Sequence, residues 1–222
     1  MLEMWRDKKG VHSGIKTLRQ NGDFRSPECI ELLEQADVIV TNPPFSIARE
    51  YYIPQLFEYN KQFLIIGDLN WITYKNIFPL LKDNKMWLGY NTVKAFIQPD
   101  GSLKKFGNKL WFTNLDIKKR HEEIILYKNY SSNEYPTFDE LPNIINVDKI
   151  TDIPIDYNGM IAVPISFLDK YNPDQFEIID ALNRYTILDY WGVNESVKER
   201  HSHCCNINGQ AKYYRIVVRK KQ

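Results

Sequence analysis

Short runs of β-branched and aliphatic residues alternate with segments of helical spacing in the first half of the chain. The apolar runs show no polar alternation and therefore predict strands buried on both faces of a parallel sheet. They are residues 37–41, 63–67 and 86–89. Helical patterns lie before and between these runs, at residues 27–35, 46–59 and 76–81, the second of them bent at Pro54. The alternating order implies an α/β domain with right-handed crossovers.

The second half of the chain is less regular. Residues 109–114 and 123–127 are typical of two antiparallel strands, and we expect them to form the hairpin that closes the sheet. Residues 129–154 hold several prolines among asparagines and aspartates and indicate an irregular connection. Three further elements are expected beyond it: an apolar run at 161–165, a helix at 173–183 and a terminal strand at 213–218. We therefore divide the chain into a core, residues 1–128, and a C-terminal extension, residues 129–222.

The composition is that of a globular protein. With 222 residues, 43% of them apolar and 14% aromatic, the chain can bury one core with a small appendage. It has no run of about 18 uncharged apolar residues and no apolar signal segment at its N-terminus, so we expect a cytoplasmic protein with no membrane partner. Two of the three cysteines, Cys204 and Cys205, are adjacent, which disfavours a disulfide and favours a reducing compartment.

Charge adds information only through its distribution. The formal net charge is +1, which does not by itself indicate a polyanionic partner. Basic residues nevertheless gather in three places, at 104–109, 118–120 and 215–221. Each cluster taken alone is more typical of a solvated surface than of a binding site.

The tetrapeptide Asn42-Pro43-Pro44-Phe45 follows the first apolar run, at the carboxyl end of the expected strand. Open parallel sheets bind ligands at this edge. The two prolines remove two N–H donors, so backbone carbonyls and the Asn42 amide oxygen can accept hydrogen bonds from a planar amine. An adenine amine held in this way becomes a better nucleophile, and Phe45 can stack on the base for about 1 to 3 kcal/mol. The alternative interpretation is a rigid turn that ends the strand.

The string from Asp37 to Phe45 resembles the signature of amino-group DNA methyltransferases. From about residue 20 to the C-terminus the chain is similar to the EcoRI-type adenine methyltransferase family. The stretches that carry this resemblance are residues 22–26, 41–46, 63–67, 72–75, 87–89 and 213–221.

The resemblance implies a partial Rossmann-like fold, S-adenosylmethionine as cofactor and double-stranded DNA as partner. A flipped adenine would be methylated on its exocyclic amine, in restriction-modification or in phage or mobile-element DNA modification. In the family, the residues matching Asn42, Pro43, Pro44 and Phe45 bind the target adenine. An acidic residue at the position of Asp23, with a neighbour such as Phe24, lies near the adenine of the cofactor.

One part of the family's cofactor site is not found in the sequence. The family has a glycine-rich loop after its first strand, whereas Gly10 and Gly14 stand in a segment that no apolar run precedes. We therefore expect N-terminal strands to be missing and to be supplied by a further segment or a partner chain. Residues 37–41 would then form an unpaired sheet edge, and the chain alone would bind the cofactor poorly.

Two other groups of residues bear on the chemistry. Residues 201–205 contain His201, His203, Cys204 and Cys205, but their spacing is poor for zinc, and we expect no metal site. No Pro-Cys dipeptide occurs, which favours an amine over a ring carbon as the methyl acceptor, since methylation of a ring carbon requires a cysteine nucleophile.

Aromatic and basic residues after the second and third strands could line a DNA groove by stacking and phosphate contact. Each of them fits a place in the core or on the solvated surface equally well. They are Trp71, Tyr74, Lys75, Lys94, Lys104, Lys105 and Lys109. The segment 89–107 is the expected target-recognition loop, because it is long, basic and contains glycines. Two alternatives stay open: methylation of an amine in RNA or in a protein glutamine, and a non-catalytic or split DNA-binding subunit.

Overall fold

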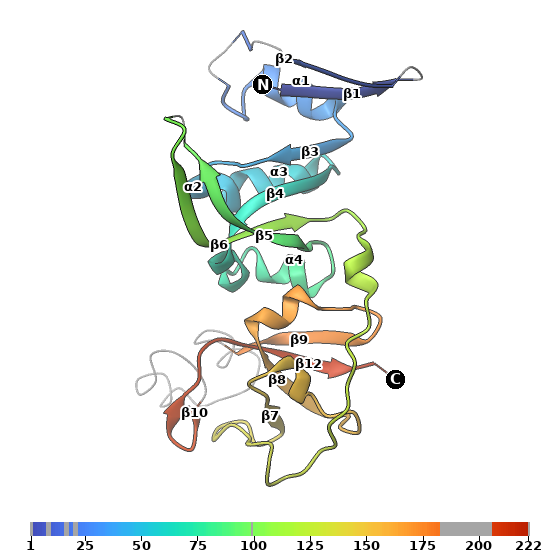
Figure 1. Cartoon of the computed structure of the whole chain (residues 1–222), viewed down its shortest axis with the longest axis vertical. Helices are drawn as coiled ribbons and strands as arrows, with labels where there is room; N and C mark the ends of the chain where they lie inside the picture. Colours follow the sequence, from blue (N-terminus) through green and yellow to red (C-terminus); the bar gives the residue numbers. More distant parts are fainter. Residues whose placement is uncertain are drawn as a thin grey trace.

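The computed structural model describes residues 2–7, 10–15, 18–19, 22–98, 100–182 and 206–221. Within these residues the fold is mixed α/β, with two four-stranded sheets that follow one another along the long axis of the molecule (Figure 1). The first sheet consists of β3 (Val38–Thr41), β4 (Gln62–Asp68), β5 (Trp87–Ile97) and β6 (Leu103–Thr113). The second consists of β7 (Ile144–Asn146), β8 (Met160–Pro164), β9 (Phe176–Leu182) and β12 (Arg215–Lys220).

Two smaller antiparallel pairs flank these sheets. They are β1 (Leu2–Asp7) with β2 (Gly10–Ile15), and β10 (Asn206–Ile207) with β11 (Gln210–Ala211). Gly10 and Gly14 therefore lie in a strand.

The first sheet confirms the direction of the three predicted strands. Its order is β3-β4-β6-β5, with β3 parallel to β4 and β6 antiparallel to both of its neighbours. The strands β3, β4 and β5 consequently run the same way. The expected continuous parallel order of the three strands is wrong at β5, because β6 inserts between β4 and β5 in the opposite direction.

The predicted pairing of residues 109–114 with 123–127 is also wrong. Residues 109–113 belong to β6, whose hairpin partner is β5. Residues 123–127 form no strand, and the side chain of Gln175 satisfies their backbone instead. Its amide donates to the Ile124 carbonyl at 2.7 Å and accepts from the Ile124 N–H at 2.9 Å. A distant glutamine thus replaces a neighbouring strand.

The helices agree with the sequence patterns. The Ser26 hydroxyl caps α1 (Pro27–Gln35) by accepting from the Cys29 N–H at 3.3 Å, and Pro27 occupies its first position. The predicted helix 46–59 consists of α2 (Phe45–Ile47), a π-helical turn (Ala48–Tyr52) and α3 (Ile53–Glu58). The irregular turn directly precedes Pro54, which has no N–H and would clash with a regular preceding turn.

The remaining helix and the 3₁₀ turns are short. They are α4 (Phe78–Lys82), η2 (Leu69–Thr73), η3 (Lys118–His121), η4 (Ile150–Asp152) and η5 (Ile165–Asp169). Among the described residues, no helix is long and apolar enough to cross a membrane.

Strand β3 lies at one edge of the first sheet. Within the described chain it pairs only with β4, in agreement with the expected edge position. Burial on both faces was wrong, because Val38 and Val40 are 39% and 64% exposed while Ile39 and Thr41 are half-buried. Successive side chains of a strand point to opposite faces of the sheet, and here one face of β3 is not covered by other described elements. Burial therefore alternates along β3 although its sequence is apolar throughout.

The second sheet corrects the helix expected at 173–183. Residues 176–182 form β9, which pairs antiparallel with β12, and Asn183 lies outside the described residues. Phe176 and Ile178 are buried on one face and Glu177 between them is exposed, so a period of two replaces the helical spacing. The two sheets fall on either side of residue 128, yet one hydrophobic cluster includes Phe112 of the first and Val218 of the second.

Candidate functional site

The carboxyl ends of β3 and β4 meet at one edge of the first sheet. Thr41 is paired with Ile65, so the sequence Asn42-Pro43-Pro44-Phe45 leaves β3 beside the last residues of β4. The last residue of β4 is Asp68, whose carboxylate caps the following turn by accepting from the Asn70 N–H at 2.9 Å. The location at the strand ends is the one that the sequence predicted for the tetrapeptide.

The tetrapeptide presents some of its polar groups to solvent and uses others internally. Asn42 and Pro44 are exposed, Pro43 is buried and Phe45 is half-buried. The Pro44 carbonyl accepts from the N–H groups of Ile47 and Ala48, at 3.2 and 3.1 Å, and thereby starts the helical run. The Pro44 carbonyl is therefore not free to accept a hydrogen bond from a ligand, contrary to what the sequence had suggested. The exposed Asn42 amide oxygen becomes the main acceptor of the tetrapeptide.

The ring of Phe45 is held by two neighbours. Its centroid lies 5.9 Å from that of Trp71, with the two rings nearly perpendicular at 82°. The Lys109 ammonium stands 4.5 Å from the Phe45 centroid, in cation–π range. Since Trp71 is only 2% exposed, the contact ties Phe45 to the core.

Lys109 is fixed by the carboxylate at the end of β4. Its Nζ lies 2.6 Å from Asp68 Oδ2, and the Asn108 amide donates to the same oxygen at 2.9 Å. The Lys109 and Asp68 side chains are only 9% and 19% exposed. The two residues are opposite one another in the β4–β6 register, so the sheet itself sets their separation. Asp68 and Asn108 were not predicted as site residues from the sequence. Asp68 directly follows the second apolar run, and an acidic residue at that place could have indicated it.

The position of Trp71 depends on a glycine. A β-carbon on Gly67 would stand 2.3 Å from the Trp71 ring and 2.8 Å from that of Phe112. The indole packs closely over β4 because residue 67 has no side chain. Trp71 is thus a core residue that supports Phe45, which selects the core interpretation of this residue over a contact with DNA.

Asp23 and Phe24 lie in the turn before α1. Phe24 packs edge-on against Tyr52, with centroids 5.2 Å apart, and the Tyr52 hydroxyl is hydrogen-bonded to the Thr41 side chain. Burial raises the pKa of Tyr52 to about 12, so this phenol stays protonated. Thr41 immediately precedes Asn42, and the two groups of predicted site residues are therefore joined through Tyr52.

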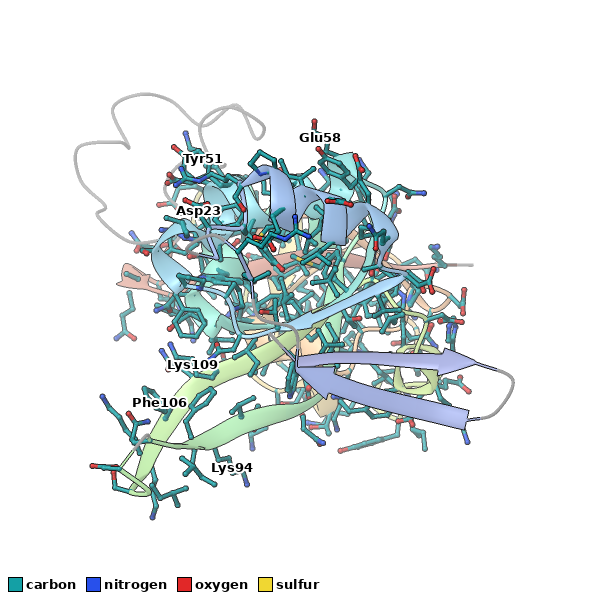
Figure 2. All side chains as sticks on the ribbon, turned by 90° about the horizontal axis from the view of Figure 1, so that it is seen from above. Asp23, Tyr51, Glu58, Lys94, Phe106 and Lys109 are labelled. Atoms are coloured by element: carbon teal, nitrogen blue, oxygen red, sulfur yellow. The ribbon has the colours of Figure 1, made fainter. Side chains whose placement is uncertain are left out.

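The Asp23 carboxylate is a half-buried acceptor. Arg25 donates to it from its side chain at 2.7 and 3.0 Å and from its backbone N–H at 2.9 Å. These hydrogen bonds, that of the guanidinium first, lower the pKa of Asp23 to about 2. In Figure 2 Asp23 and Tyr51 lie on the helical side of the molecule, whereas Phe106 and Lys109 lie on the hairpin side.

The remaining basic residues divide into two kinds. Lys94, Lys104 and Lys105 are exposed on the β5–β6 hairpin. The segment 89–107 is, however, not a loop, since most of it lies in the two strands of that hairpin. Near the C-terminus, Arg215 and Lys212 are paired with Asp148, at 2.7 and 3.2 Å.

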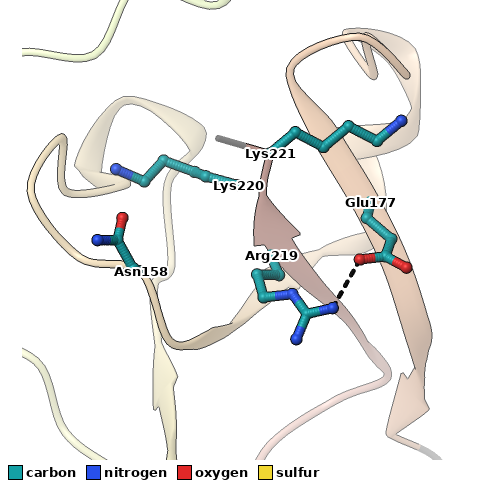
Figure 3. A pocket seen from close by; sticks show the side chains of 5 residues that line it. All are labelled: Asn158, Glu177, Arg219, Lys220 and Lys221. Atoms are coloured by element: carbon teal, nitrogen blue, oxygen red, sulfur yellow. Dashed lines mark hydrogen bonds and ion pairs between the residues drawn. The ribbon is translucent and has the colours of Figure 1, made fainter.

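A separate polar pocket of about 570 Å³ lies beside the second sheet, where Arg219 of β12 and Glu177 of β9 are 2.8 Å apart (Figure 3). Its other lining residues are Asn158, Lys220 and Lys221. Lys220 also donates to the Ile155 carbonyl, and burial lowers the pKa of its ammonium. The ion pair neutralises part of the charge of this pocket. The histidines and cysteines of residues 201–205 lie outside the described residues.

Comparison with known proteins extends these observations over nearly the whole chain. The family described as "Adenine-specific methyltransferase EcoRI" matches residues 5–221. The chain belongs to this family. The EcoRI-type resemblance carried by the tetrapeptide and its neighbours is thereby confirmed, and membership implies a methyl donor.

Three curated relatives are Type II methyltransferases. M.EcoRI of Escherichia coli is 43% identical over 91% of this chain and 63% of its own length. M.MgeORF184P of Mycoplasma genitalium is 40% identical over 92% of this chain and 71% of its own length. M.MpnI of Mycoplasma pneumoniae is 36% identical over 92% of this chain and 70% of its own length. The match therefore spans between 63% and 71% of these relatives, and no solved structure matches the chain.

Proposed function

We propose that this chain binds a flipped adenine of duplex DNA and takes part in the transfer of a methyl group from S-adenosylmethionine to its exocyclic amine. The observation that carries the proposal is the exposed Asn42 amide beside a Phe45 ring that Trp71 and Lys109 hold in place. The description of the family as adenine-specific and the names of the relatives support the same reaction. The setting that these names favour is restriction-modification.

The residues of the tetrapeptide would act on the adenine in two ways. The Asn42 side-chain oxygen would accept a hydrogen bond from the exocyclic amine, which increases the electron density on its nitrogen as the new bond forms. Phe45 would stack on the base, and because its ring is already fixed, little rotational freedom is lost on binding. When bound, S-adenosylmethionine supplies a methyl group on a positively charged sulfur.

Asp23 and Phe24 suit the cofactor's adenine by their chemistry. With a pKa of about 2 the Asp23 carboxylate is ionised at neutral pH, so it can only accept hydrogen bonds, as a donor amine requires. Phe24 is fixed against Tyr52 and offers an apolar neighbour. We assign these two residues to the cofactor within the same proposal.

The wider architecture is interpreted in the same way. The parallel strands β3 and β4, with β5 running in their direction, are compatible with part of a Rossmann-like sheet that has its ligand edge at Asn42. We keep the division into a catalytic core, residues 1–128, and an extension, residues 129–222. A cytoplasmic location also stays a prediction.

The test is to express the chain in bacteria that lack adenine methyltransferases and to measure N6-methyladenine in their digested DNA by mass spectrometry. We expect the modified base when the wild-type chain is expressed together with the further segment or partner chain that completes the cofactor site. We expect about 100-fold less with Asn42→Ala, the size of effect seen when one preorganised hydrogen bond is removed from a transition state. Asn129→Ala, an exposed asparagine of the C-terminal half, serves as the matched control.

The same cells separate the competing substrates. Methylated adenine in RNA or methylated glutamine in protein, without N6-methyladenine in DNA, would replace DNA as the acceptor. The absence of all three products would refute the proposal for this chain.

A further inference from the structure

The β5–β6 hairpin extends well beyond the sheet to which it belongs. Strand β4 pairs with residues 109–113 of β6, whereas residues 103–108 lie beyond its end. On the other side, residues 93–97 of β5 continue the pairing out to the turn. The outer half of the hairpin is therefore a two-stranded arm, which projects from the rest of the molecule and carries Lys94 and Phe106 (Figure 2).

The end of this arm is apolar and has a defined shape. Ile97 and Leu103 form the last cross-strand pair, and they are 79% and 61% exposed. The Gln98 N–H donates to the Ser102 carbonyl at 2.8 Å, and the Asp100 carboxylate accepts from both the N–H and the hydroxyl of Ser102, at 2.9 and 2.6 Å. These bonds close the turn and hold the two aliphatic side chains together at the tip.

Aromatic and basic side chains support the tip. Phe96 and Phe106 pack edge to face with centroids 5.2 Å apart, and the Lys104 ammonium lies 5.4 Å from the Phe106 centroid. Lys104 and Lys105 are exposed, as is Lys94 on the opposite strand. The acidic side chain at the tip, Asp100, already has its carboxylate bound within the turn.

An exposed aliphatic pair backed by lysines fits one kind of partner better than others. Minor-groove and architectural proteins insert apolar side chains between base steps, and cationic side chains beside them bind the phosphates. A two-stranded ribbon is also narrow enough for the major groove. A purely apolar protein partner would leave the lysines without a role.

We propose that the β5–β6 hairpin is a DNA-inserting arm, in which Ile97 and Leu103 enter the base stack while Lys94, Lys104 and Lys105 bind the flanking phosphates. This inference depends on the proposed function in one respect, namely that the partner is DNA. The tip is six residues from Lys109 along β6, about 20 Å at 3.3 Å per residue. The arm therefore contacts the duplex several base pairs away from the adenine held at Asn42.

The decisive experiment compares two short duplexes of the same sequence, one fully paired and one with a central mismatch, by fluorescence anisotropy. Unstacking a mismatched step costs less than unstacking a paired one, so wild type should bind the mismatched duplex about 3- to 10-fold more tightly. The double variant Ile97→Ala/Leu103→Ala should lose this preference. Ile125→Ala, which shortens an 81% exposed isoleucine outside the hairpin, should keep it.

The phosphate contacts have a separate readout. Each lost contact reduces the slope of log K against log salt by about 0.9, so Lys94→Gln/Lys105→Gln should lower the slope by about 2 and leave the mismatch preference unchanged. Lys118→Gln, which changes an exposed lysine outside the hairpin, should leave the slope unchanged. Since all the altered side chains are exposed, melting temperatures should stay close to that of wild type.

The outcomes distinguish this proposal from the proposed function. A preference that survives in Ile97→Ala/Leu103→Ala but disappears in Asn42→Ala would overturn the arm and leave base flipping intact. Loss of the preference in the hairpin variant, in a chain that transfers no methyl group, would support the arm without the enzyme. No binding of wild type to either duplex would overturn both.

Discussion

The ion pair between Asp68 and Lys109 gives the sharpest test of how the site is held together. It joins the carboxyl end of β4 to β6 at 2.6 Å, and the same ammonium lies over Phe45. We predict that Asp68→Asn destabilises the fold more than Lys109→Met, and that the two changes together cost less than their sum.

The magnitudes follow from the burial of the pair. Removing one partner of a buried ion pair costs about 3 to 5 kcal/mol, and the partial exposure of Asp68 together with the oxygen kept by asparagine reduces this to about 2 to 3 kcal/mol. Lys109→Met should cost about 1 to 2 kcal/mol, since Asp68 keeps the hydrogen bonds from Asn108 and Asn70 and methionine keeps most of the buried stem. The double variant leaves no unpaired buried charge, so its cost should fall about 2 kcal/mol below the sum of the single variants.

Urea unfolding followed by circular dichroism measures the free energy of unfolding of wild type, of each single variant and of the double variant. The comparison requires that the free energy of unfolding falls with urea concentration at the same slope in all four proteins. A double-mutant cycle at Lys119 and Asp169 serves as the control, because this pair is also 2.6 Å apart but Asp169 is 51% exposed. Its coupling free energy should be below about 1 kcal/mol. A coupling at Asp68 and Lys109 no larger than that of the control would contradict the role given to burial. Methyl transfer by the Lys109→Met chain should fall with little change in DNA affinity, because Phe45 loses a support. The phosphate contact that the sequence allowed for Lys109 is not expected, since its ammonium is buried against Asp68.

Two further variants probe packing and charge. Gly67→Ala should lower stability by about 2 to 3 kcal/mol in urea unfolding, because the added carbon would stand 2.3 Å from the buried Trp71 ring; an unchanged midpoint would show that the indole can move. His121 lies between Asp116 at 2.7 Å and Asp174 at 3.1 Å, and these hydrogen bonds, that of Asp116 first, raise its pKa above 6.5. The interaction of protonated His121 with these carboxylates stabilises the fold fully below about pH 6.5, and this stability is lost as the pH rises through the pKa of His121 in the folded chain. The melting temperature of His121→Gln should therefore lie furthest below that of wild type in acid. A difference that grows toward alkaline pH would refute this sign.

Each variant has a control in the chain. Gly107→Ala adds a carbon with no atom within 4 Å and should leave the midpoint near that of wild type. Asp116→Asn should reduce the pH dependence attributed to His121 without removing it, since Asp174 remains.

Much of the first sheet and of the site could be predicted because the signals are local. The cap at Ser26, the apolar runs that became β3 and β4, and the proline-rich turn after β3 each depend on residues close together in sequence. The family resemblance followed from the same short strings and is confirmed by the match over residues 5–221.

The tertiary structure decided which distant residues meet. The insertion of β6 between β4 and β5, the replacement of a helix by β9, and the use of Gln175 to satisfy Ile124 all depend on partners far along the chain. The pairing of Asp68 with Lys109 spans 41 residues. Local spacing fixes which faces of a segment are apolar, but only the competition among distant partners for the same hydrogen bonds and buried volume selects the neighbour that covers them.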